Sequence, residues 1–168
     1  MSYVPKILIV DDEPRMCDSL KVLLSGQSYE IHTSNNGKEA IKSLTENVFD
    51  LVLLDIIMPD MDGRRVMEYI NSRSPGTPII LMTGHASIES AVTALKNGAY
   101  DYLQKPFEHE KLLKTVRNAI DQKRLDSDRK RAEKDWENTF DAVTDMVMVL
   151  DSEHRIIRVN KATAETLN

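Results

Sequence analysis

The sequence predicts an α/β fold in which a five-stranded parallel sheet is covered by helices on both faces. Short apolar runs alternate five times with segments whose apolar residues recur at helical spacing. The connections between them are short, as is usual when parallel strands and helices alternate along the chain. In addition, ionisable side chains directly follow several of the apolar runs, where open α/β sheets place their sites.

The first two strand–helix pairs begin the chain. The first strand covers residues 6–10, and the helix after it opens at Glu13-Pro14, with proline in its first turn, and stops at Gly26. The second strand, residues 29–34, is more polar and is expected on the outside of the sheet. Asn35-Asn36-Gly37 then leads into a helix that buries Ala40, Ile41 and Leu44.

The third strand, residues 50–54, is the most apolar and is therefore expected at the centre. A loop rich in turn-forming residues, 58–63, connects it to a helix that buries Val66, Met67 and Ile70. The fourth strand, residues 78–82, ends at Thr83-Gly84. The third and fourth strands are thus expected to form the central part of the sheet.

The last strand–helix pair follows a fourth helix that is marked by Ile88, Ala91, Val92 and Leu95 and capped by Gly98. The fifth strand covers residues 102–104. The fifth helix begins near Glu108 and has one apolar face, formed by Leu112, Leu113, Val116, Ala119 and Ile120.

The chain changes character after Ile120. Between Asp121 and Asp135 the apolar residues are Leu125 and Ala132, and such a polar helix usually connects domains or forms a weak coiled coil. Neither glycine nor proline occurs from 108 to 143, so we expect one helix of about 50 Å. Apolar strands at 146–150 and 155–159 then flank a turn-rich link and predict a hairpin, and Ala162, Ala164 and Leu167 indicate a further helix.

Composition narrows the class of protein. A net charge of -5 gives no general attraction to nucleic acid or to anionic membranes. No apolar run approaches the roughly 20 residues of a membrane-spanning helix, and the first residues do not resemble a signal peptide. We therefore expect a cytoplasmic protein. Cys17, the only cysteine, has the spacing of a packed helix residue.

Acidic side chains and one lysine are expected to meet at the carboxyl edge of the sheet. Asp11 and Asp12 follow the first strand, Asp55 follows the third and Lys105 follows the fifth. Three carboxylates in such proximity repel one another unless a cation lies among them. The pattern therefore predicts a divalent metal site with a lysine beside it, which is typical of phosphate chemistry.

Four motifs, in order, resemble those of the receiver domain of two-component response regulators: Val10-Asp11-Asp12-Glu13, Leu54-Asp55-Ile56-Ile57-Met58-Pro59-Asp60-Met61-Asp62-Gly63, Met82-Thr83-Gly84-His85 and Tyr102-Leu103-Gln104-Lys105-Pro106-Phe107. The resemblance covers residues 4–122 and implies a flavodoxin-like doubly wound sheet. Residues 140–162 resemble the opening of a PAS sensor domain. The implied organisation is a receiver domain (1–122), a helical or coiled-coil linker (123–135) and the first part of a PAS domain (136–168).

The resemblance also implies roles for the residues at the carboxyl edge. Asp55 is the implied nucleophile, which accepts a phosphoryl group and becomes an acyl phosphate. Mg2+ is the implied cofactor, held by Asp12 and Asp55, by Asp11 through water and by the backbone carbonyl of Ile57.

Three further side chains complete the implied site. Lys105 supplies positive charge to the transferred group, and a cis bond to Pro106 is expected. The hydroxyl of Thr83 donates to a phosphoryl oxygen, and Tyr102 is the aromatic switch that responds to Thr83. His85 is expected at the rim of the pocket, where it and Ile57 flank the approach of water.

The implied function is phosphorelay signalling. A sensor histidine kinase or a histidine phosphotransfer protein would donate the phosphoryl group, and the charged site would switch the outer face and the linker helix, which control a downstream module. Self-dephosphorylation is expected to be slow, and a full-length protein with a histidine kinase core is compatible with this chain. A parallel homodimer is expected through the fifth helix and linker, because Leu113, Val116 and Ile120 have heptad-like spacing.

Two other functions share parts of this pattern. A Mg2+-dependent phosphatase of the haloacid dehalogenase type would use an aspartate nucleophile like Asp55, but it needs an acid two residues later, where this chain has Ile57. A flavodoxin-like cofactor binder needs a hydroxyl-rich phosphate loop after the first strand, where the acidic Asp11-Asp12-Glu13 would repel a flavin phosphate.

Overall fold

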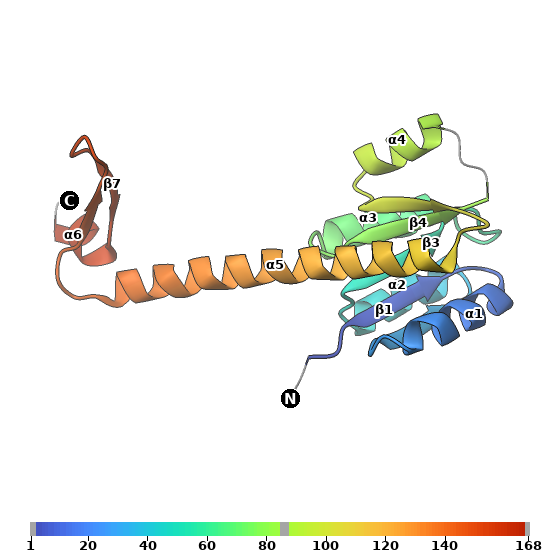
Figure 1. The fold of residues 1–168 in the computed structure, drawn as a ribbon. Helices are drawn as coiled ribbons and strands as arrows, with labels where there is room; N and C mark the ends of the chain where they lie inside the picture. The colour runs from blue at the N-terminus through green and yellow to red at the C-terminus, as the bar shows by residue number, and fades with distance from the viewer. Residues whose placement is uncertain (1–2, 85–87, 167–168) are drawn as a thin grey trace. The chain divides into compact units, whose positions relative to one another are not determined.

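The computed structural model describes residues 3–84 and 88–166, with the side chains of 88–91 excepted, and it divides into two compact units after Lys123. The first unit contains a parallel sheet with strand order β2-β1-β3-β4-β5 (Figure 1). The strands are β1 (Lys6–Val10), β2 (Glu30–Ser34), β3 (Leu51–Asp55), β4 (Ile79–Thr83) and β5 (Asp101–Gln104). The sequence-based prediction of a doubly wound α/β sheet, with its third strand central and its second at an edge, is confirmed.

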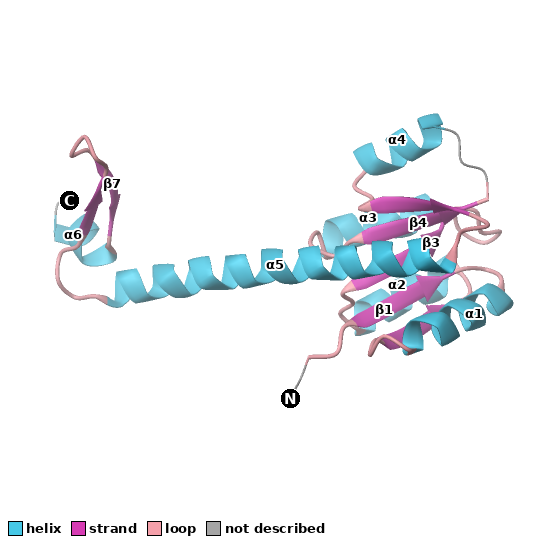
Figure 2. Ribbon diagram, viewed as in Figure 1, coloured by secondary structure: helices cyan, strands magenta, loops and turns pink. Residues whose placement is uncertain are grey.

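Helices cover both faces of this sheet (Figure 2). They are α1 (Pro14–Ser25), α2 (Gly37–Glu46), α3 (Gly63–Arg73), α4 (Ile88–Lys96) and α5 (His109–Ala142). Side chains of α1 and α5 pack with one face of the strands, and those of α2, α3 and α4 pack with the other. In β3, Leu51 and Leu53 join the first cluster while Val52 and Leu54 join the second, as the two-residue period of a strand requires. Burial on both faces explains why this strand is apolar throughout.

Helix α5 is continuous over 34 residues, which corresponds to about 50 Å and confirms the predicted long helix. Its buried side chains are Leu112, Thr115, Val116, Ala119 and Ile120. Val116 and Ile120 therefore belong to the core of the first unit, together with the partly buried Leu113. The expectation that these three residues form a dimer seam was wrong, because apolar spacing of three and four residues also serves a helix that packs on a sheet.

Lys123 marks the end of α5 within the first unit. Its ammonium donates a hydrogen bond of 2.7 Å to the carbonyl of Phe49 and lies 3.3 Å from Asp50 Oδ1. Burial lowers the pKa of Lys123, with Asp50 opposing the shift. Asp50 also accepts hydrogen bonds from Tyr3 and from the amide of Lys6, so this cluster ties α5 to the starts of β1 and β3.

The second unit contains the rest of α5, an antiparallel pair of strands, β6 (Met148–Leu150) and β7 (Ile156–Val159), and the short helix α6 (Lys161–Thr166). The strands are shorter than the sequence suggested, and Leu167 lies outside the described residues. Asn160 is fully buried and connects these elements: its Nδ2 donates to Val143 and Asp145 carbonyls, and its Oδ1 accepts from Val147 and Thr163. Among the described residues, no helix has both the length and the apolar character to cross a membrane.

Candidate functional site

The ends of β1 and β3 bring three carboxylates together at the carboxyl edge of the sheet. The strands are neighbours, with Val10 opposite Leu54, so the residues that follow lie side by side. One oxygen from each of Asp11, Asp12 and Asp55 lies within 4.8 Å of the other two. The residues Asp11 and Asp55 are buried, whereas Asp12 is exposed.

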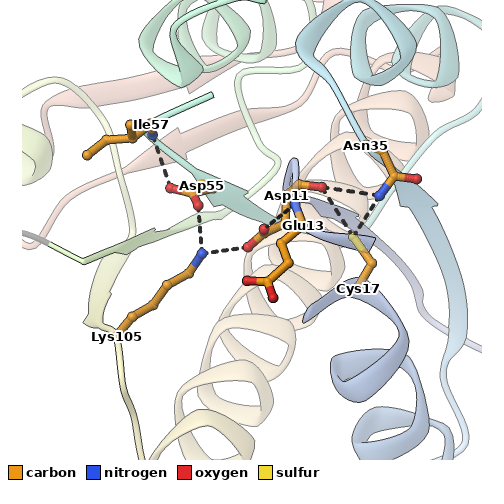
Figure 3. A network of polar contacts seen from close by, with 7 residues as sticks. All are labelled: Asp11, Glu13, Cys17, Asn35, Asp55, Ile57 and Lys105. Atoms are coloured by element: carbon orange, nitrogen blue, oxygen red, sulfur yellow. Dashed lines mark hydrogen bonds and ion pairs between the residues drawn. The ribbon is translucent and has the colours of Figure 1, made fainter. Parts of the chain in front are cut away.

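Lys105 connects two of these acids from β5, which is separated from β3 by β4. It follows β5, and its Nζ donates hydrogen bonds of 2.6 Å to Asp11 Oδ2 and of 2.6 Å to Asp55 Oδ2 (Figure 3). Burial acts to lower the pKa of Lys105, but these two hydrogen bonds outweigh it and hold the pKa above its ordinary value. Burial raises the pKa of Asp11, since Lys105 offsets only part of the lost hydration. Lys105 is thus a fixed positive charge between two buried acids.

Backbone amides hold the second oxygen of each buried carboxylate. The amide of Glu13 donates to Asp11 Oδ1 and that of Ile57 donates to Asp55 Oδ1, both at 3.0 Å (Figure 3). Each of these carboxylates therefore has one oxygen on an amide and the other on Lys105. This arrangement fixes the direction in which Asp55 presents its oxygens to an incoming group.

Gly63, the first residue of α3, packs directly against the backbone of Asp55. A Cβ at this position would lie 2.2 Å from the Asp55 carbonyl oxygen and 2.9 Å from Ile56 Cα. The Gly63 amide also donates to the carbonyl of Ile56 at 3.0 Å. The sequence placed Gly63 in a turn-rich loop and at the end of a receiver motif, but the local pattern does not reveal which backbone it packs against.

Thr83 and Tyr102 lie on the same face of the sheet. Tyr102 of β5 is opposite Leu81 of β4, and Thr83 follows Leu81 by two residues. The side chains of Thr83 and Tyr102 therefore point toward the face of the sheet that α2, α3 and α4 cover, called the α2–α4 face below. Thr83 is buried, and Tyr102 is partly buried against the cluster on that face. The amide of Lys105 donates to the Thr83 carbonyl at 2.7 Å, and the Lys105–Pro106 bond is cis. His85 lies outside the described residues.

The donor set suits Mg2+. Carboxylate oxygens are its preferred protein ligands, and at about 2.1 Å from the ion they would lie about 3 to 4 Å apart. The spread of 4.8 Å among Asp11, Asp12 and Asp55 is close to this, so small side-chain rotations suffice. The Cys17 thiol accepts a contact from Asn35 and donates to the Asp11 carbonyl, and burial raises its pKa to about 11. The thiol is therefore neutral at neutral pH.

The turn between β2 and α2 also reaches the site, and sequence reasoning missed it. Asn35 Nδ2 donates to the Asp11 carbonyl at 3.3 Å (Figure 3). Gly37, the first residue of α2, touches the loop that follows Asp55. Asn35-Asn36-Gly37 had been interpreted only as a helix start, which it also is, because Asn36 Oδ1 accepts a hydrogen bond from the Glu39 amide.

Comparison with known sequences gives one family. The model of the response regulator receiver domain matches residues 7–117. The transcriptional regulatory protein ZraR of Klebsiella oxytoca is 44% identical over 119 residues, which are 71% of this chain and 27% of that protein. ZraR of Escherichia coli K12 is 42% identical over 114 residues, or 68% of this chain and 26% of that protein. The chain thus spans about a quarter of the length of these curated relatives.

Solved structures are similar over the same part of the chain. A CheY-like receiver domain protein from Methanospirillum hungatei JF-1 is 33% identical with a TM-score of 0.70, over 74% of this chain and 99% of that one. The beryllofluoride-activated NtrC4 receiver domain dimer is 38% identical with a TM-score of 0.67, over 70% of this chain and 98% of that one. These findings do not support the phosphatase alternative.

Proposed function

Since this chain belongs to the family of response regulator receiver domains of two-component systems, we propose that Asp55 is its phosphoacceptor. The observation that carries this assignment is the position of Asp55 at the end of the central strand, between Lys105 Nζ and the Ile57 amide. Asp11 and Asp12 stand beside it and complete an oxygen-rich cluster. A carboxylate held in this way is a nucleophile in a site that can neutralise a phosphoryl group.

The proposed reaction is transfer from a phosphohistidine. A carboxylate oxygen of Asp55 bonds to phosphorus while the phosphorus–nitrogen bond of the donor breaks, which leaves an acyl phosphate on Asp55 and an imidazole that takes up a proton. Mg2+, held by Asp12, Asp55, the Ile57 carbonyl and Asp11 through water, would neutralise the phosphoryl oxygens when bound. Lys105 is placed to shift its hydrogen bond from Asp55 to the transferred group.

The test is phosphorylation of the 168-residue chain by acetyl phosphate with Mg2+. We expect one acid-labile phosphoryl group per chain by mass spectrometry, and none on Asp55→Asn. Asp18→Asn is the matched control, because Asp18 is an exposed aspartate on α1. Undiminished acid-labile phosphate on Asp55→Asn would refute the assignment.

Thr83 and Tyr102 are the proposed switch. They share the α2–α4 face of the sheet, and the Lys105 amide is bonded to the Thr83 carbonyl. If the Thr83 hydroxyl donated a hydrogen bond to a phosphoryl oxygen, the space available to the half-buried Tyr102 ring would change, and with it the outer face beside β5. The phosphoryl group itself would come from a sensor histidine kinase or a histidine phosphotransfer protein. Thr83→Ala should accept phosphate while losing the change in Tyr102, read from its ring signals by NMR.

We further propose a receiver domain over residues 1–122, a helical linker over 123–135 and the start of a PAS domain over 136–168. The first boundary is supported by the division of the structure after Lys123. For the last segment, support comes from the hairpin β6–β7, whose apolar side chains are largely exposed, as expected of a sheet that further strands complete: Met148, Leu150, Ile156 and Ile157.

A parallel homodimer through the linker part of α5 is the last element of this proposal. Leu125 is 64% exposed, and Ala132, also exposed, follows seven residues later, so both lie along one stripe. The related NtrC4 receiver domain is described as a dimer in its beryllofluoride-activated form. Light scattering should give a dimer for the full chain and a smaller species for residues 1–122. A monomeric full chain at tens of micromolar, with and without beryllofluoride, would refute this.

A further inference from the structure

We propose that Gly37, at the start of α2, is a positioning residue for Asp55, acting through the loop of residues 56–62. Gly37 comes after β2, which is one of the two edge strands and contributes no acid to the site. Only the expected effect on phosphorylation rests on the proposed function. The contact between Gly37 and the loop is a property of the fold.

The backbone of Gly37 presses against Met61 of this loop. A Cβ on Gly37 would lie 2.8 Å from Met61 Cβ, 3.0 Å from its Sδ and 3.1 Å from its Cγ. Gly37 is buried, and its φ lies outside the left-handed region that favours glycine. Lack of space beside Met61, and not backbone conformation, therefore requires a residue without a side chain here.

A hydrogen bond fixes the neighbouring residue of the loop to the same point. The amide of Gly37 donates to Asp60 Oδ1 at 3.3 Å, and a carboxylate at the first turn of a helix is also favoured by the helix dipole. Met61 is partly buried and packs against the apolar cluster to which α2, α3 and α4 contribute. The middle of the loop is thus seated on α2 by both a polar and an apolar contact.

Both ends of the same loop are attached to Asp55. The Ile57 amide donates to Asp55 Oδ1, and the Gly63 amide donates to the Ile56 carbonyl while its Cα packs against the Asp55 carbonyl. The loop is short, so a displacement at Met61 is transmitted to the Ile57 amide. Moving that amide would release Asp55 Oδ1, and it would also move the Ile57 carbonyl that is proposed to hold Mg2+.

The same turn supports the other acid-bearing strand. Asn35 Nδ2 donates to the Asp11 carbonyl at 3.3 Å and contacts Cys17 Sγ at 3.6 Å (Figure 3). The Asp11 amide donates to the Ser34 carbonyl at 3.2 Å. Asn35 is exposed, so its contribution is smaller than that of the buried Gly37. The turn from Ser34 to Gly37 therefore braces both strand ends that carry the carboxylates.

Four forms of the 168-residue chain test the inference: wild type, Gly37→Ala, Met61→Gly and the double variant. The readouts are amide hydrogen exchange at Ile57 and Gly63, the affinity for Mg2+ alone, and the rate of phosphorylation by acetyl phosphate. Gly37→Ala should raise exchange and weaken Mg2+ binding, each by about tenfold, as is typical when groups that orient metal ligands are disturbed. The double variant should reverse most of both effects, because Met61→Gly removes the three atoms nearest to the added Cβ.

Thermal unfolding separates positioning from folding. Gly37→Ala should still unfold in one cooperative transition, at a somewhat lower temperature than wild type, because the loop must move to make room for the added methyl group. If Gly37→Ala fails to fold, Asp60→Ala and Asp60→Asn take its place: the alanine should raise exchange at Ile57, and the asparagine, which keeps the acceptor oxygen, should not.

Wild-type exchange at Ile57 in Gly37→Ala, or no recovery in the double variant, would overturn the inference. In the substitute pair, equal exchange in Asp60→Ala and Asp60→Asn would do the same. A wild-type chain that accepts no phosphoryl group, combined with the expected exchange pattern, would instead refute the proposed function and leave the loop contact established.

Discussion

Replacing Lys105 by methionine should reveal how much of the stability of the first unit depends on a positive charge among the acids. Lys105 Nζ makes hydrogen bonds of 2.6 Å to both Asp11 and Asp55, and methionine keeps much of its volume without the charge. The buried carboxylates would then repel each other with no cation between them. Without a divalent ion, Lys105→Met should therefore be destabilised.

The expected loss of stability in Lys105→Met follows from the geometry of its two ion pairs. At 2.6 Å and an effective dielectric constant of about 20, each ion pair has a gross Coulomb energy of about 6 kcal/mol. Most of this is offset by the dehydration of Lys105, whose side chain is 18% exposed. Breaking a buried pair from one side usually costs about 3 to 5 kcal/mol. We expect a loss of about 3 kcal/mol in the free energy of unfolding, because Asp12 and part of Lys105 remain hydrated.

The free energy of unfolding of both proteins can be measured by urea titration, monitored by circular dichroism, in EDTA and in excess MgCl2. Mg2+ at 100 times its dissociation constant should stabilise the wild type by about 2.7 kcal/mol. It should stabilise Lys105→Met by more, since the ion then replaces the missing charge, and the gap between the two proteins should narrow to about 1 kcal/mol. Lys21→Met, on the exposed face of α1, is the control. Equal stability of Lys105→Met and wild type in EDTA, or a gap that Mg2+ leaves unchanged, would refute the reasoning.

Four further outcomes are expected. Ile57→Asn should shorten the lifetime of phosphoryl-Asp55, because an amide side chain can orient water, and phosphate loss no faster than in wild type would contradict this. Gly63→Ala should cost about 3 kcal/mol or more of unfolding free energy, since its Cβ would lie 2.2 Å from the Asp55 carbonyl oxygen; a normally stable variant would show that the contact yields. Burial raises the pKa of Cys17 from 9.0 to about 11, so wild type should lose up to about 3 kcal/mol relative to Cys17→Ser as pH rises from 9 to 11 and nothing below pH 9; parallel pH profiles would exclude this linkage. Asn160→Ala should destabilise the second unit by about 3 kcal/mol, read by Trp136 fluorescence, with the first unit unchanged by amide exchange, and an unaltered fluorescence transition would count against it.

The sequence predicted the sheet because its signals are local. Apolar runs such as residues 51–54 identify strands buried on both faces, and the side chains that follow them lie at the carboxyl edge in any parallel sheet. The prediction that Asp11, Asp12, Asp55 and Lys105 meet needed no more than this, and the structure places them together. The length of α5 was equally predictable, since neither glycine nor proline interrupts it.

Other features depend on contacts between residues that are distant in the chain. The spacing of Leu113, Val116 and Ile120 fits a dimer seam and a core-facing helix equally well, and only the packing of α5 on the sheet decides for the core. The order β2-β1-β3 brings the turn after β2 beside both acid-bearing strands, so Gly37 meets Met61 and Asn35 meets the Asp11 carbonyl. Periodicity and strand direction are local properties, so they are enough to predict which elements form and which side chains share an edge. Which turn lies against the acid-bearing strands depends on which strands become neighbours and on the space between their loops, and these emerge only when the sheet assembles.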